Sequence, residues 1–82
     1  MNHKEIFEAL CKLLISNEFV GNMIISEDMR LGDDLGIDSL TYIAILCTIE
    51  QNFNIIVKES EMNITEKLSI RDLVNLIEDS LN

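Results

Sequence analysis

Apolar residues recur at helical spacing in three separate stretches of the chain, and this periodicity limits the fold more than any other feature. It predicts helices over residues 3–16, from Leu40 to Phe53, and from about Ser69 to the end. Ser69 is the expected N-cap of the last helix, and a short helical turn over 59–64 is predicted to be capped by Ser60. The one extended pattern, residues 55–57, is too short to build a sheet. The fold class is therefore all-α, a small bundle.

A long connection separates the first two helices. All three glycines fall between positions 21 and 36, and a connection from Asn17 to Ile37 exceeds the roughly 2–8 residues usual between bundled helices. It is nevertheless rich in apolar residues, which predicts an ordered crossover packed along the bundle. These residues are Phe19, Val20, Met23, Ile24, Ile25, Met29, Leu31, Leu35 and Ile37. With 82 residues, the chain is expected to form a single domain, 1–82, with one core.

The charge balance narrows the choice of partners. Fifteen acidic residues against six basic ones give a net charge of -9, on a chain that is 48% hydrophobic and so expected to fold. Such a charge disfavours nucleic acid and anionic membranes and favours proteins with basic patches. We find no membrane-spanning or secretory pattern and expect a cytoplasmic protein. Cys11 and Cys47 lack the spacing of a zinc site and are expected to be reduced, and no metal is predicted.

The middle helix is apolar on two sides. At 100° per residue, one stripe suits the core and consists of Tyr42, Ile45, Leu46, Ile49 and Phe53. Leu40, Ile43 and Cys47 form a second stripe that a single core does not need. Either the loop or the short helix covers this second stripe, or it is a docking surface for a partner. Its position beside Ser39 favours docking.

Asp38 and Ser39 open this helix, and capping is the simplest explanation for either residue. A catalytic triad is not expected, because the only histidine, His3, lies at the chain terminus and no Gly-x-Ser-x-Gly turn surrounds Ser39. Asp33, Asp34 and Asp38 lack the spacing of a calcium loop. No catalytic residue is predicted, and we do not expect an enzyme.

The segment Leu35-Gly36-Ile37-Asp38-Ser39-Leu40 resembles the signature of the acyl carrier protein family. The resemblance extends over nearly the whole chain through the helix order, the long first loop and the acidic balance. It implies a four-helix bundle with three longer helices and one short one. It also implies that a phosphopantetheinyl transferase moves 4′-phosphopantetheine from coenzyme A onto Ser39. By the same resemblance Asp38 assists the magnesium-dependent transfer, and Leu40 contacts partners.

The implied partners are the transferase and acyl-transferring or condensing enzymes with basic docking patches. We expect the carrier to be a monomer. The residues expected to contact its partners are Leu40, Ile43, Cys47 and Asp34. Fatty-acid carriers usually have acids early in the motif helix, where Thr41 and Ala44 stand here. We expect an acyl carrier of fatty acid, polyketide or related biosynthesis. A peptidyl or aminoacyl carrier is the alternative, and an unmodified acidic interaction module is a third hypothesis. Residues that would line a space for an acyl chain, or form ordinary core, are Leu46, Ile49, Ile56, Ile64 and Leu68.

Overall fold

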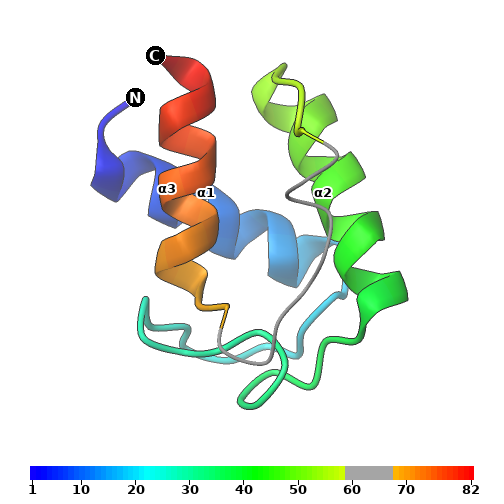
Figure 1. Ribbon diagram of the computed structural model, residues 1–82. Helices are drawn as coiled ribbons and strands as arrows, with labels where there is room; N and C mark the ends of the chain where they lie inside the picture. Colours follow the sequence, from blue (N-terminus) through cyan, green and yellow to red (C-terminus); the bar gives the residue numbers. More distant parts are fainter. Residues whose placement is uncertain (59–67) are drawn as a thin grey trace.

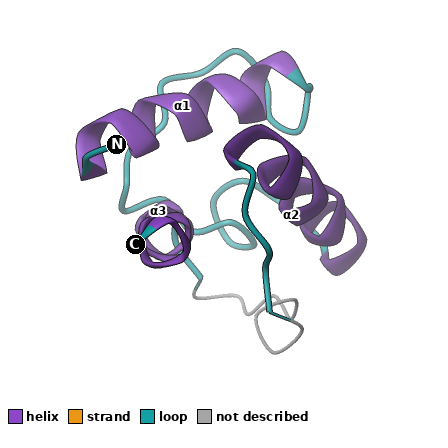
Figure 2. Cartoon of the chain, turned by 90° about the horizontal axis from the view of Figure 1, so that it is seen from above, coloured by secondary structure: helices purple, strands orange, loops and turns teal. Residues whose placement is uncertain are grey.

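The computed structural model describes residues 1–58 and 68–82, and within these ranges it contains three α-helices and no strand. They are α1 (His3–Ser16), α2 (Ser39–Phe53) and α3 (Ile70–Leu81). Helix α1 lies across both of the others, and the two chain ends lie on the same side of the molecule (Figures 1 and 2). The described part of the chain is therefore all-α, as predicted. The predicted short helix over 59–64, with its Ser60 cap, lies outside the described residues.

Side chains fix where α1 and α3 begin. The Asn2 side-chain oxygen accepts the Glu5 N–H at 2.8 Å, and the Glu5 carboxylate accepts the Asn2 N–H at 2.9 Å. Ser69 and Asp72 make the same reciprocal pair, at 3.2 and 2.8 Å. Each pair satisfies amide groups that the first helical turn leaves without a partner. The predicted cap at Ser69 is confirmed.

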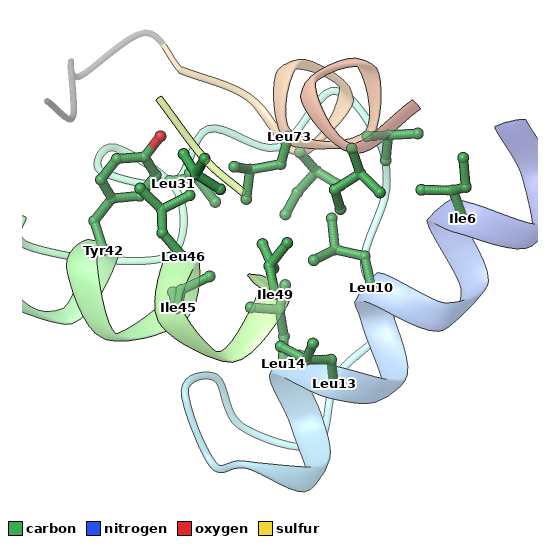
Figure 3. Close-up of a cluster of buried hydrophobic side chains, with 14 of the residues drawn as sticks. Ile6, Leu10, Leu13, Leu14, Leu31, Tyr42, Ile45, Leu46, Ile49 and Leu73 are labelled. Atoms are coloured by element: carbon green, nitrogen blue, oxygen red, sulfur yellow. The ribbon is translucent and has the colours of Figure 1, made fainter. Parts of the chain in front are cut away.

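The core consists of aliphatic side chains and one tyrosine, which the three helices and the segments that follow α1 and α2 direct inward (Figure 3). The fully buried side chains are Ile6, Leu10, Leu14, Leu31, Tyr42, Ile45, Leu46, Ile49, Ile70, Leu73, Val74 and Ile77. No polar or charged residue of the described ranges is buried. The predicted inner stripe of α2 is confirmed at its first four positions, whereas Phe53 is only partly buried. Because each buried aliphatic side chain contributes roughly 1.5–3 kcal/mol, this interior is the main source of stability.

The long loop is an ordered crossover, as predicted, because three of its apolar residues enter the core. Ile25, Leu31 and Ile37 are buried, whereas Phe19, Val20, Met29 and Leu35 are partly buried against it. The prediction was wrong for Met23 and Ile24, which are exposed, Ile24 by 91%.

Backbone hydrogen bonds hold the second half of this loop against the start of α3. The Leu31 N–H donates to the Leu68 carbonyl at 2.8 Å, and the Ile70 N–H donates to the Met29 carbonyl at 2.9 Å. These bonds satisfy backbone groups that would otherwise be unpaired near the core. They fix the path of the chain as it approaches α2.

An ion-pair cluster joins the start of α1, the loop and α3. The His3 ring contacts Glu27 at 2.6 Å through Nε2 and Glu78 at 3.5 Å through Nδ1. Arg71 contacts Glu27 at 3.8 Å and Asp28 at 2.9 Å. The hydrogen bond to Glu27, followed by the contact with Glu78, raises the pKa of His3 above its usual 6.5. His3 is thus the first residue of α1 and a cross-link, rather than part of a loose terminus.

The residues considered for an acyl-chain space separate into core and surface. Leu46 and Ile49 are buried core residues, and Leu68 is partly buried against the core. Ile56 is 86% exposed, so its assignment to an interior lining was wrong. It follows α2 in a segment whose neighbours Ile55 and Val57 point inward, and alternation along extended backbone turns Ile56 to solvent. Ile64 lies outside the described residues.

Candidate functional site

The chain makes a sharp turn immediately before α2. Gly36 has a backbone φ of +67°, a left-handed conformation that side-chain-bearing residues rarely adopt. One residue later the Ile37 N–H donates to the Leu31 carbonyl at 2.9 Å, and the Ile37 side chain is buried. Glycine therefore permits the turn and Ile37 anchors it. Together they fix the position at which α2 begins.

Asp38 caps α2. Its carboxylate accepts the Thr41 N–H at 2.8 Å, and this bond is the main reason why the pKa of Asp38 lies below its ordinary value. The capping interpretation of this pair of residues is confirmed for Asp38. The helix begins at Ser39, one residue earlier than the predicted Leu40. The Asp38 carboxylate is therefore bound to the helix that it starts and stays ionised to lower pH than an ordinary aspartate.

Ser39 is the first residue of α2, a helix of 15 residues, and its side chain is exposed. No group in the described parts of the chain hydrogen-bonds to its hydroxyl. Amide N–H groups in the first turn of a helix lack helical partners, and with the helix dipole they favour an anion nearby. A phosphodiester on the Ser39 oxygen would therefore lie where negative charge is tolerated. The residues present fit a phosphate-linked group.

The second apolar stripe of α2 is exposed. Leu40 is exposed by 80% and Ile43 by 43%, and Cys47 is also exposed. We call these three residues the docking stripe. They face away from the inner stripe, and the described loop leaves them exposed, so the alternative in which the loop covers them is wrong. The predicted short helix, the other segment considered as a cover, lies outside the described residues. An apolar face this close to Ser39 is available to a partner protein.

Acidic side chains gather ahead of the docking stripe. Asp33, Asp34 and Asp38 are all exposed. Asp34 accepts the Arg30 N–H at 2.7 Å, and Asp33 lies 3.6 Å from the Arg30 guanidinium. Asp34, which we predicted to bind partners, therefore also stabilises its own turn. Arg30 was missed by the sequence analysis, although its spacing of three and four residues from two acids was the available signal.

The described residues carry no metal cluster and no membrane-spanning helix. No group of three or more His, Cys, Asp or Glu side chains in these ranges is arranged to hold a metal ion. Among residues 1–58 and 68–82, no helix is both long and apolar enough to cross a membrane. Cys11 and Cys47 are free cysteines, on α1 and α2.

Comparison with known proteins identifies the family. A family model described as "Phosphopantetheine attachment site" matches residues 7–77. The chain belongs to the acyl carrier protein family. It is 32% identical to an acyl carrier protein of Rickettsia bellii and 33% identical to one of Campylobacter hominis. These alignments cover 90% of this chain, with 89% and 91% of the respective relatives.

Membership explains several of the observations above. Acyl carrier proteins are carriers rather than enzymes, and they hold 4′-phosphopantetheine covalently. They interact with phosphopantetheinyl transferases and with biosynthetic enzymes. The predicted cofactor and the prediction that the chain is not an enzyme are confirmed.

Proposed function

We propose that the chain is a single acyl carrier domain, 1–82, that carries acyl intermediates on a phosphopantetheine arm attached to Ser39. The observation that carries this proposal is the exposed Ser39 hydroxyl at the start of α2, which has no hydrogen-bond partner among the described residues. The matched segment, residues 7–77, contains this serine. When bound, the arm supplies a terminal thiol on which acyl groups are held as thioesters.

The transfer reaction assigns a simple role to the serine. The Ser39 oxygen forms a bond to the β-phosphorus of coenzyme A while the phosphoanhydride bond breaks. Adenosine 3′,5′-bisphosphate leaves, and the hydroxyl proton passes to a base of the transferase. The carrier needs no histidine near Ser39 for this reaction, since the enzyme activates the hydroxyl. The amide groups of the first turn then favour the new phosphodiester.

Asp38 has two roles in this proposal. It holds the first turn of α2 in place through the Thr41 N–H, which positions the neighbouring serine. Its carboxylate is ionised beside the reacting hydroxyl, and its lowered pKa extends this to more acidic solution than for an ordinary aspartate. That charge would meet the magnesium ion that the transferase brings. Asp38 thus positions Ser39 and assists the metal-dependent transfer.

Partner enzymes meet the carrier at the same end of the molecule. The docking stripe supplies apolar contact, and the acids at the helix start, Asp34 among them, attract basic patches. A small contact of this kind permits rapid release, as a shuttle requires. The net charge of -9 opposes association of two copies, so we propose a monomer.

The cargo is proposed to be acyl, within fatty acid, polyketide or related biosynthesis, since relatives over most of the chain are named acyl carrier proteins. A peptidyl or aminoacyl cargo is the alternative, favoured by the lack of acids in the first turns of α2. To distinguish the two cargoes, the protein that carries phosphopantetheine but no acyl group is incubated with malonyl-coenzyme A and a malonyl transferase. In a parallel reaction it is incubated with amino acids, ATP and an adenylating enzyme. Acylation by the first system alone supports the proposal, and aminoacylation alone supports the alternative.

Attachment at Ser39 is tested by intact mass after incubation with coenzyme A, magnesium and a broad-specificity phosphopantetheinyl transferase. The wild type should gain one phosphopantetheine, and Ser39→Ala should gain none. Ser26→Ala is the matched control, because Ser26 is also exposed but lies in the loop. Modification of Ser39→Ala would refute the assignment. Folded wild type that several transferases leave unmodified would favour an unmodified interaction module.

A further inference from the structure

Helix α2 differs from the other helices in the charge of its surface. Glu50 is its only charged residue, whereas α1 and α3 both carry acids and bases on their exposed faces. This is unexpected in a chain with a net charge of -9. The helix that begins at Ser39 is therefore the least charged helical surface among the described residues.

Glu50 does not charge the docking stripe. It lies 11 positions after Ser39, which is about 16 Å along the helix axis. Its carboxylate accepts the Val57 N–H at 2.8 Å and is partly buried. The Glu50 carboxylate therefore binds the segment that follows α2. Between Ser39 and Glu50 the exposed side chains are uncharged.

Negative charge is instead concentrated at the start of the helix. Asp33, Asp34 and Asp38 are exposed there, and of these three carboxylates the Arg30 guanidinium approaches that of Asp33. A partner thus meets two adjacent surfaces of different character. One is an acidic rim before Ser39, and the other is an uncharged apolar face along α2.

We infer that the phosphopantetheinyl transferase acting on this chain meets α2 through an apolar, uncharged surface, and that its basic residues face only the acidic rim. This inference rests on the proposed attachment at Ser39, because the transferase must reach that residue. A lysine or arginine opposite the docking stripe would lose its hydration without gaining an acidic partner from residues 1–58 or 68–82. A second copy of this chain is a poor occupant, since each copy carries a charge of -9.

Ala44 offers a clean test of the charge opposite α2. It is exposed, and helical periodicity places it beside Leu40 and Cys47. Glutamate, glutamine and lysine are all good helix formers, so the three substitutions at this position differ mainly in charge. Unfolding curves that coincide for the three variants would establish that any difference in modification is not a folding effect.

The assay measures kcat/KM for modification of the apo protein by the phosphopantetheinyl transferase of the same genome, at low and high salt. We expect Ala44→Gln to be the fastest, with Ala44→Glu and Ala44→Lys each slower by about tenfold, because both bury an unpaired charge. The ratio of Ala44→Glu to Ala44→Gln should change little with salt, since desolvation is not screened.

A basic partner surface would give a different order. Ala44→Glu would then be at least as fast as Ala44→Gln, Ala44→Lys would be slowest, and salt would reduce the differences. Equal rates for all three variants would also overturn the inference. In either case the wild type is still modified, so the proposal for Ser39 stands. Absence of modification in wild type and variants alike refutes the proposed function itself.

Discussion

Replacing Ile49 by alanine should destabilise the protein far more than replacing Leu40, although both residues lie on α2. Ile49 is fully buried and points toward the side of the core that Leu10 and Leu14 of α1 supply (Figure 3). Leu40 is instead 80% exposed. Ile49→Ala removes three buried carbon atoms, at about 0.8 kcal/mol each, and leaves a cavity, so we expect a loss of about 3–4 kcal/mol. For Leu40→Ala we expect a change within about 0.5 kcal/mol.

The expected loss for Ile49→Ala is large relative to the whole fold. Domains are stable by roughly 0.05–0.15 kcal/mol per residue, which gives about 4–12 kcal/mol for this chain. Urea unfolding followed by circular dichroism yields the free energy of unfolding of both variants. The melting temperature of Ile49→Ala should fall by at least roughly 12 °C. Equal destabilisation by the two substitutions, or a loss below about 1 kcal/mol at Ile49, would refute our assignment of the two faces of α2.

Further substitutions test three separate features of the fold. Gly36→Ala should lower the free energy of unfolding by about 1–2 kcal/mol, because alanine disfavours the positive φ at this position. Gly21→Ala is the control, since Gly21 also has open space around it but no positive φ, and it should be neutral or stabilising by up to about 1 kcal/mol. Chemical unfolding of both variants checks this difference. Ser69→Ala should cost about 1 kcal/mol through loss of the α3 cap, measured in the same way. The raised pKa of His3 means that its ion pairs contribute fully below pH 6.5 and are lost as pH rises through the folded-state pKa. The free energy of unfolding should therefore decline as pH rises through that range, and the decline should be weaker in His3→Gln. Unfolding measured at a series of pH values checks this. Identical pH profiles for the wild type and His3→Gln would contradict the role of His3.

Features that depend on local spacing could be predicted from the sequence. The two stripes of α2 follow from the 100° rotation per residue. This rotation places Tyr42, which is buried, and Leu40, which is exposed, on different faces of the helix. The cap at Ser69 follows from the chemistry of its side chain three residues before Asp72. In the same way, the position of Asp38 and Ser39 at the start of an amphipathic helix is visible in the spacing of the apolar residues that follow them.

Features that depend on distant residues could not be predicted. His3 and Glu27 are 24 positions apart, and no periodicity indicates that the loop brings them within 2.6 Å. Loop residues follow no fixed rotation either, which is why the sequence did not separate exposed Ile24 from buried Ile25. The Glu50 carboxylate accepts the Val57 N–H, seven positions further along the chain, and no local pattern indicates this hydrogen bond.

Fragmentation of the modified protein tests the central claim most directly. The protein is loaded with phosphopantetheine from coenzyme A and digested, and the modified peptide is sequenced by tandem mass spectrometry. Our account predicts that fragment ions place the whole added mass on Ser39. Localisation of the group on any other residue, such as exposed Ser16 or Ser80, would contradict it.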